Sequence, residues 1–212
     1  MKPYRPLLSF FLSLSLISSV SAQFKEKIFM VQVRTDRGEV PMAFHERPSD
    51  YGRFIGYHRY KKPSIPIDTE GELYIPDSVT APDGQCLPVC WISRGAFQGC
   101  QNLTKISLPH TLEYISDYSL QDCTSLREII LSDSLKIIYP QAFIGCNALQ
   151  RIVVRGSRPP DSYNDSGFSE DVRNTATVVF PPASEKAYKT NNVFEFFRYH
   201  VNLLPTYPKQ QP

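Results

Sequence analysis

The sequence repeats one pattern three times, as AFQGCQNLTKISL at residues 96–108, SLQDCTSLREIIL at residues 119–131 and AFIGCNALQRIVV at residues 142–154. Their cysteines, Cys100, Cys123 and Cys146, follow one another at intervals of 23 residues, and every apolar column is kept. A fixed period of this length is typical of a repeat array, in which each unit buries its apolar face against its neighbours. The pattern therefore predicts a repeat solenoid, a scaffold for recognition that carries no chemistry of its own.

The N-terminus has the features of a secretory signal peptide at residues 1–22. Lys2 and Arg5 precede a Leu/Phe/Ser stretch at residues 7–20, and small side chains follow up to Ala22. A membrane anchor is the alternative, but this short stretch contains five serines and a span needs about 20 apolar residues. We expect cleavage near Ala22 and no transmembrane segment in the mature chain.

Charge argues against a nucleic-acid partner. The chain has 23 basic and 21 acidic side chains, and removal of residues 1–22 takes away two basic ones, so the mature charge is near zero. A basic cluster occurs at residues 59–62, where a solvated loop is favoured over a phosphate-binding patch. The hydrophobic fraction of 42% is sufficient for a sizeable core.

Segments around the repeats predict caps. Residues 23–70 contain two apolar runs, 28–33 and 40–44, separated by a turn, and are expected to form a β-hairpin N-terminal cap. The repeats extend over residues 71–154, with a hairpin insertion at residues 80–89.

The part of the chain after the repeats, residues 155–212, is expected to end the solenoid. An irregular loop with Phe168 as its buried anchor comes first, and a final strand follows at residues 177–181. A short helix with a Ser184 N-cap and an apolar segment at residues 193–197 complete the C-terminal cap.

The motif Ala-Phe-x-Gly-Cys-x-x-Leu-x-x-Ile-x-Leu-Pro-x-x-Leu-x-x-Ile, complete in residues 96–115, closely resembles the BspA-type leucine-rich repeat of bacterial secreted and surface proteins. The resemblance covers roughly residues 71–200. It implies a strand-rich, right-handed α/β coil with one short strand per repeat in a parallel concave sheet, and no particular ligand. The second copy departs from the motif at Leu120, Asp122 and Ser132, which we expect on the solenoid surface.

Residues that alternate with the inward columns should face out of this sheet in two rows. The charged row contains Glu72, Lys105, Glu128, Arg151 and Thr177. The second row contains Tyr74, Ser107, Ile130, Val153 and Val179.

Each row has two interpretations. Strands lie about 4.8 Å apart, so opposite charges in the charged row are neighbours and form either a self-satisfied ladder or a site for a charged ligand. The second row is largely apolar and is either a partner surface or is covered by the loop at residues 155–176. The candidate binding residues are Tyr74, Lys105, Ser107, Glu128, Ile130, Arg151, Val153 and Val179.

The cysteines fall into two groups. Cys100, Cys123 and Cys146 share one structural column, and buried free thiols are favoured over a disulfide because three equivalent residues cannot all pair. Cys86 and Cys90 lie at the hairpin insertion, where a disulfide is a possible pairing in a secreted protein.

Catalytic, metal-binding and cofactor-binding motifs are not found. The four histidines are scattered through separate elements, and no phosphate loop or nucleophile elbow occurs. We therefore assign no catalytic, cofactor-binding or metal-binding residues.

Three functional hypotheses follow. The first is a secreted, non-enzymatic recognition module, periplasmic or extracellular, that binds a protein or glycan through the concave face. The second is a structural or self-associating cell-envelope component. The third is an enzyme with a pocket in the N-terminal cap around His45, His58 and Tyr51.

Overall fold

The structure is a computed structural model that describes residues 27–46, 53–55, 62–162 and 167–201. The expected signal peptide at residues 1–22 lies outside these ranges, as do Tyr51, His58 and most of the basic cluster at residues 59–62. Within the described ranges, no helix has the length and apolar character needed to cross a membrane.

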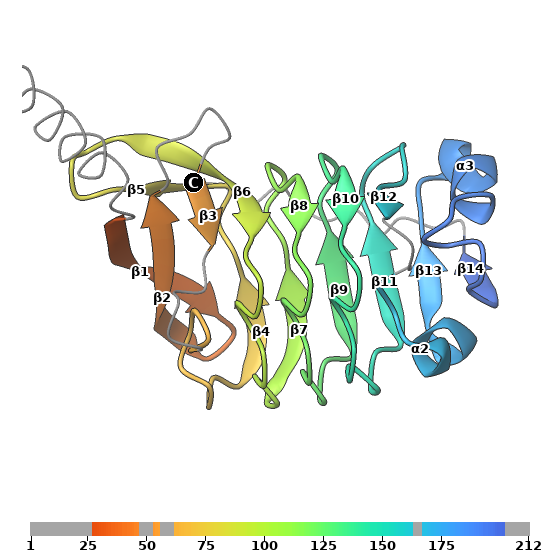
Figure 1. Ribbon diagram of the computed structural model, residues 1–212, viewed down its shortest axis with the longest axis horizontal. Coiled ribbons are helices and arrows are strands. Elements are labelled where there is room, and N and C mark those ends of the chain that lie inside the picture. Colours follow the sequence, from red (N-terminus) through yellow and green to blue (C-terminus); the bar gives the residue numbers. More distant parts are fainter. Residues whose placement is uncertain (1–26, 47–52, 56–61, 163–166, 202–212) are drawn as a thin grey trace, which may run out of the picture.

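The chain winds into a β-solenoid whose coils stack along the long axis of the molecule (Figure 1). Parallel strands line two sides of the coils, here called the first arm and the second arm. The first arm contains β4 (Gly71–Tyr74), β7 (Leu103–Ser107), β9 (Glu128–Leu131), β11 (Arg151–Val154), β13 (Thr177–Val179) and β14 (Tyr199–Val201). The second arm contains β6 (Cys86–Ile92), β8 (Tyr114–Ile115), β10 (Ile137–Ile138) and β12 (Asp161–Ser162).

Two strands per repeat differ from the single strand that we expected. Tyr114–Ile115 pairs in parallel with Ile137–Ile138, so the segment after each motif forms its own short ladder. The reason is the second pair of inward columns, since Leu112 and Ile115 are fully buried like Ile106 and Leu108 on the first arm. Each repeat therefore has two apolar segments that face the core, and each of them pairs as a strand with its equivalent in the next coil.

The core lies between the arms. Ile106, Ile129 and Ile152 of the first arm and Ile115 and Ile138 of the second arm are fully buried in one hydrophobic cluster. Each of these side chains stacks on its counterpart in the next coil, which explains why the apolar columns recur with the 23-residue period. Removing apolar side chains of this size from water contributes roughly 1.5–3 kcal/mol each.

The segment around each cysteine forms the third side of the coil. Successive turns are joined by backbone hydrogen bonds, such as Phe97 N to Ser119 O at 2.7 Å and Leu120 N to Ala142 O at 2.9 Å. Two positions in each of the three turns at residues 95–99, 118–122 and 141–145 have a positive φ. The first is occupied by Gly95, Tyr118 and Gln141 and the second by Gly99, Asp122 and Gly145.

The N-terminal hairpin joins the two arms. β1 (Lys27–Thr35) pairs antiparallel with β2 (Gly38–Glu46), as the sequence predicted, and β1 also pairs with β4. β2 reaches the second arm through β3 (Arg53–Ile55), which pairs with β6. Because Phe29, Val33, Met42 and Phe44 are buried, the hairpin covers the first coil.

The predicted insertion is also a hairpin. β5 (Ser78–Thr80) pairs antiparallel with the start of β6, with Ser78 opposite Pro88 and Thr80 opposite Cys86.

The C-terminal end contains more regular structure than expected. Phe168 is buried and stacks on Phe143 with ring centroids 4.4 Å apart, as an anchor should. The segment we expected to be an irregular loop contains β12 and the helix α2 (Glu170–Thr175), whose N-cap Ser169 accepts a hydrogen bond from Val172 N. The helix was missed because six residues are too few for a hydrophobic period.

The last helix is present where the sequence predicted it, but its cap is different. A 3-10 turn η1 (Pro182–Ser184) leads into α3 (Glu185–Lys189), and Ser184 makes no side-chain cap. Its hydroxyl donates to Pro181 O at 2.7 Å instead. Val193, Phe194 and Phe197 are buried and cover the last coil.

The three departures in the second motif are not all surface residues. Leu120 is fully buried, and Ser132 is buried with its hydroxyl donating to His110 O at 2.8 Å. Asp122 has a φ of 59°, where the other copies have glycine. In residues other than glycine, this left-handed conformation costs roughly 1–2 kcal/mol.

This strain predicts that Gln141→Gly stabilises the protein. Gln141 has a φ of 59°, and its side chain makes no hydrogen bond to another residue that the structure describes. Relief of the strain, less the entropy cost of a new glycine, should raise the free energy of unfolding by about 0.5–1 kcal/mol, measured by urea denaturation.

Gly99→Ala is the matched control. Gly99 has a φ of 76°, and a Cβ there would meet its nearest atom, Ile67 Cδ1, at an ordinary 3.5 Å. The change should therefore cost about 1 kcal/mol through backbone strain alone. A destabilised Gln141→Gly variant would contradict the account.

Candidate functional site

The charged row lies in the register that the sequence predicted. Glu72 is opposite Lys105, Lys105 is opposite Glu128, and Glu128 is opposite Arg151. Lys105 Nζ lies 3.4 Å from Glu72 Oε2 and 3.2 Å from Glu128 Oε1, and Arg151 Nε lies 3.1 Å from Glu128 Oε2. The alternating charges satisfy one another, which favours the ladder over an unfilled site for a charged ligand.

The ladder keeps its central lysine charged. Partial burial of the Lys105 ammonium opposes charging, but the carboxylates of Glu128 and Glu72 outweigh it and leave the pKa of Lys105 above its ordinary value. Side-chain exposure along the row is 34% for Glu72, 21% for Glu128 and 41% for Arg151. The row is therefore accessible although its charges are paired.

Tyr74 ends the second row beside the ladder. Its hydroxyl donates to Glu72, and this bond together with burial raises the pKa of Tyr74. The guanidinium of Arg34 lies 5.5 Å from the ring centroid of Tyr74. The N-terminal hairpin thus contacts the candidate surface directly.

The rest of the second row is buried. Ser107, Ile130, Val153 and Val179 are at most 2% exposed, and the last three form a small apolar cluster apart from the main core. The idea that these side chains are open to a partner is therefore corrected. Alternation along a strand gives the side of the sheet, but it does not tell whether another part of the chain covers that side.

Arg155 is one residue that crosses this row. It follows β11, and its guanidinium donates to Leu108 O at 2.9 Å and to Ser107 Oγ at 3.1 Å, at the end of β7. The side chain therefore spans the width of β9. Arg155 belongs to the segment at residues 155–176, so its position favours cover by the chain itself.

The three cysteines of the structural column, Cys100, Cys123 and Cys146, are buried and form no disulfide, as expected. Cys123 Sγ donates to Phe97 O and Cys146 Sγ donates to Leu120 O, both at 3.1 Å, so two thiols are hydrogen-bonded to the turn of the preceding coil. Burial raises the pKa of Cys100 to about 12. The pKa of Cys123 is also raised well above its ordinary value, by the neighbouring Cys146 thiol and by burial.

The structure contradicts the possible disulfide between Cys86 and Cys90. Both thiols are free, Cys86 exposed and Cys90 buried. The two residues lie four apart in the single extended strand β6, which separates their Cα atoms by roughly 13 Å, whereas a disulfide needs about 4.4–6.8 Å. The sequence predicted both at the hairpin insertion, and the structure places both in the strand that follows its turn.

The pocket expected in the N-terminal cap is apolar. A groove of about 330 Å³ is lined by Ile28, Met30, Pro41, His45 and Ile65, among others. His45 itself is only 5% exposed. Among the described residues, no group of three His, Cys, Asp or Glu side chains is placed to hold a metal ion.

Aromatic rings mark the second arm, which sequence reasoning did not consider. Trp91 stacks on Tyr114 with ring centroids 4.5 Å apart, and Trp91 Nε1 donates to Ser116 Oγ at 2.6 Å. Trp91 also stacks on Tyr139 with ring centroids 6.2 Å apart, so the rings pack mainly on one another along this arm.

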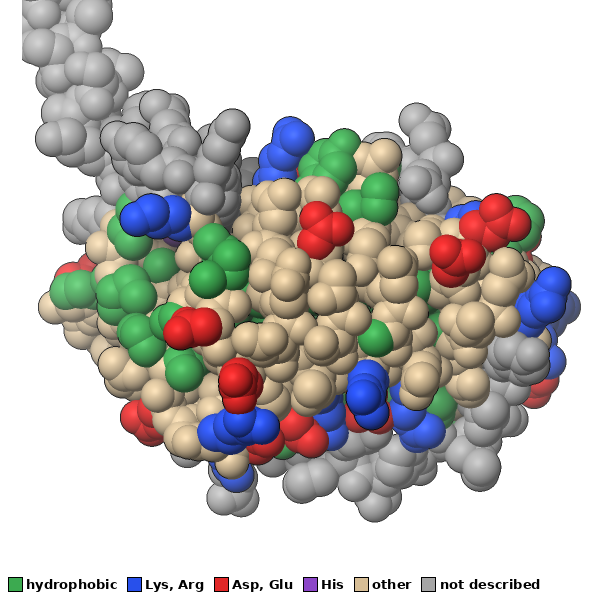
Figure 2. Space-filling model, turned by 90° about the horizontal axis from the view of Figure 1, so that it is seen from below, with side chains coloured by type: hydrophobic (Ala, Val, Ile, Leu, Met, Phe, Trp, Pro, Cys, Tyr) green, Lys and Arg blue, Asp and Glu red, His purple; other side chains and the backbone are tan. Residues whose placement is uncertain are grey.

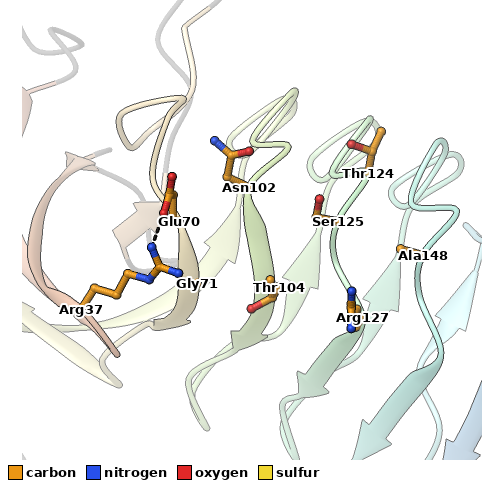
Figure 3. A pocket seen from close by; sticks show the side chains of 9 residues that line it. All are labelled: Arg37, Glu70, Gly71, Asn102, Thr104, Thr124, Ser125, Arg127 and Ala148. Atoms are coloured by element: carbon orange, nitrogen blue, oxygen red, sulfur yellow. Dashed lines mark hydrogen bonds and ion pairs between the residues drawn. The ribbon is translucent and has the colours of Figure 1, made fainter.

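A polar groove lies where the strands of the first arm begin (Figure 3). Its volume is about 340 Å³, and it was also missed by sequence reasoning. The available signal was the equivalence of Asn102, Ser125 and Ala148 and of Thr104 and Arg127 in successive copies. The full lining is Arg37, Glu70, Gly71, Asn102, Thr104, Thr124, Ser125, Arg127 and Ala148.

These features define a class of protein, a capped β-solenoid of short repeats with accessible polar surfaces on its first arm. The model of the family described as BspA type leucine rich repeat region (6 copies) matches residues 77–195. The chain belongs to this family, as its motif indicated.

A solved structure has the same fold. It is the crystal structure of a leucine-rich repeat protein from Bacteroides capillosus ATCC 29799, which is 25% identical in sequence to this chain. The match covers 71% of this chain and 97% of that chain, with a TM-score of 0.54. No curated protein matches the chain.

The buried thiols predict a pH-dependent stability. Thiols of the unfolded chain ionise near pH 8.5, whereas Cys100 and Cys123 keep their protons in the folded protein to higher pH. Their contribution is complete below about pH 8.5 and decreases as pH rises, by up to about 1.4 kcal/mol per pH unit for each thiol.

Urea denaturation between pH 8 and pH 11 measures this slope. Cys100→Ala should give a shallower decline than the wild type, whereas Cys86→Ser should not, since Cys86 is exposed. Equal slopes for all three proteins would show that the column thiols do not carry the effect.

Proposed function

We propose that the chain is a secreted, non-enzymatic recognition module that binds a protein or glycan outside the bacterial cytoplasm through the outer face of the first arm. Membership of the BspA-type family supports a binding role in general. The observation that carries the choice of face is the charged row, in which Glu72, Lys105, Glu128 and Arg151 are held in register by ion pairs.

A surface of this kind suits recognition because its side chains are ordered before binding. Side-chain ordering at an interface costs about 0.5–1.5 kcal/mol for each long side chain that must be immobilised. Residues that already hold one another in ion pairs have lost much of this freedom. The row also presents alternating charges, which discriminate between partners through charge complementarity more than they add affinity.

The residues proposed to make contact are Tyr74, Lys105, Glu128 and Arg151. Ser107, Ile130, Val153 and Val179 lie beside them on the same face of the sheet, but these four side chains are buried and are not proposed to make contact. This assignment replaces the apolar row by the charged row as the contact surface.

A binding screen of the mature chain against purified matrix proteins and polysaccharides tests the proposal. Arg151→Glu should weaken binding of any partner at least tenfold, because it reverses the most exposed charge of the row. Lys189→Glu is the control, since Lys189 is similarly exposed in α3 and should leave binding unchanged. Full affinity of the Arg151→Glu variant would exclude this face.

Self-association as a cell-envelope component is the second candidate. It is favoured by the exposure of Ile28 (41%), Met30 (57%) and Ile67 (57%) near the apolar groove of the N-terminal cap. Figure 2 shows hydrophobic side chains gathered at the end of the molecule that carries this cap. Exposed apolar patches often mark contacts between proteins.

Sedimentation of the mature chain separates the two candidates. If the chain self-associates through the cap, it should form oligomers that the Met30→Glu substitution abolishes. Ile144→Glu is the control, because Ile144 is an exposed apolar residue elsewhere on the surface, and this variant should still form the oligomers. A single monomeric species over a wide concentration range would dispose of this candidate.

A further inference from the structure

The polar groove is built from four successive coils and the N-terminal hairpin, and the first of these coils contributes Glu70 and Gly71. Asn102 and Thr104 come from one coil, and Thr124, Ser125 and Arg127 come from the next. Ala148 belongs to the fourth, and Arg37 reaches in from the turn between β1 and β2 (Figure 3). The groove therefore runs across the coils, in the direction along which they stack.

The hairpin is fixed at this edge by Asp36. Its carboxylate accepts a hydrogen bond from Glu72 N at 2.7 Å, and its own N–H donates to Glu72 O at 3.2 Å. Gly71 makes this approach possible, because a Cβ there would lie 2.3 Å from Asp36 Oδ1. The wall that carries Arg37 is thus attached to the first strand of the arm.

The groove differs from the charged row because most of its polar side chains lack a hydrogen-bond or ion-pair partner among the described residues. Asn102, Thr104, Thr124, Ser125 and Arg127 make no side-chain hydrogen bond or ion pair within the part of the chain that the structure describes. Together they present a guanidinium, an amide and three hydroxyl groups to solvent. Each hydroxyl and the amide can both donate and accept, whereas the guanidinium only donates.

The charges of the groove favour a ligand with isolated negative charges. Arg37 is paired with Glu70, which leaves the exposed Arg127 as the unpaired charge among the lining residues. A guanidinium binds a carboxylate through two parallel hydrogen bonds. A nucleic-acid backbone needs several clustered positive charges, which this lining does not provide.

The lining also disfavours a peptide. Protein partners are held mainly by aromatic and aliphatic anchors in apolar pockets, and the apolar lining here consists of Gly71 and Ala148. A ligand rich in hydroxyl groups matches the donors and acceptors that are present. Neighbouring coils are about 4.8 Å apart, a spacing comparable to the length of one sugar in an extended glycan.

We propose that this groove binds an acidic oligosaccharide, with a uronic acid carboxylate on Arg127 and sugar hydroxyl groups on Asn102, Thr104, Thr124 and Ser125. The inference rests on the proposed recognition function and names a ligand class for it, at a site beside the charged row. Arg37 and Glu70 close the end of the groove at the N-terminal hairpin.

Calorimetric titration of the mature chain with tetragalacturonate tests the inference. The wild type should bind it, and Arg127→Gln should weaken binding at least tenfold. Arg158→Gln is the matched control, because Arg158 is an exposed arginine that forms no ion pair with a described residue and does not line the groove. It should bind as the wild type does.

Two further comparisons define the ligand and the site. Methyl-esterified tetragalacturonate has the same backbone without the charges and should bind at least tenfold more weakly. Thr124→Val should weaken binding several-fold while leaving the unfolding midpoint unchanged, since Thr124 is exposed. Equal binding of the methyl ester, no effect of Arg127→Gln, or no binding of tetragalacturonate would each overturn the inference.

The Arg151→Glu variant separates this inference from the proposed function. It should keep its affinity for tetragalacturonate because Arg151 does not line the groove. If a macromolecule binds through the charged row and tetragalacturonate does not bind, the ligand class fails and the recognition role stands. If neither binds, both fail.

Discussion

The stacking of buried apolar side chains between coils is the constraint on which the rest of the structure depends. Ile106, Ile129 and Ile152 are fully buried at equivalent positions of paired strands, and a shift by one residue would turn each of them outward. The same register places Lys105 beside Glu128 and Glu128 beside Arg151. The outward surfaces are therefore consequences of inward packing.

Much of the fold follows from the sequence, because the 23-residue period reports the inward columns directly. The parallel sheet, the N-terminal hairpin and the order of the charged row are present as predicted. The second strand of each repeat was missed because Tyr114–Ile115 is only two residues long. The helix at Glu170–Thr175 lies outside the repeat and has too few residues to show a period.

The site was less predictable because it depends on what lies over and between the coils. The alternation of side chains along the strands shows that Ile130 and Val153 point away from the main core. Their burial depends on what covers this face of the sheet, which includes the side chain of Arg155. The polar groove combines residues of neighbouring coils with Arg37, which is far away in sequence. The first arm thus has a row whose charges are satisfied and a groove in which several polar side chains have no partner among the described residues, and the two can take different parts in recognition.

The free energy of unfolding of charge-reversed variants tests the register most directly. Glu128→Lys places a third positive charge between Lys105 and Arg151 and should cost about 1–2 kcal/mol. Reversing all four charges, with Glu72→Lys, Lys105→Glu, Glu128→Lys and Arg151→Glu, restores the alternation and should recover most of that loss. A fourfold variant that is less stable than Glu128→Lys alone would contradict the account.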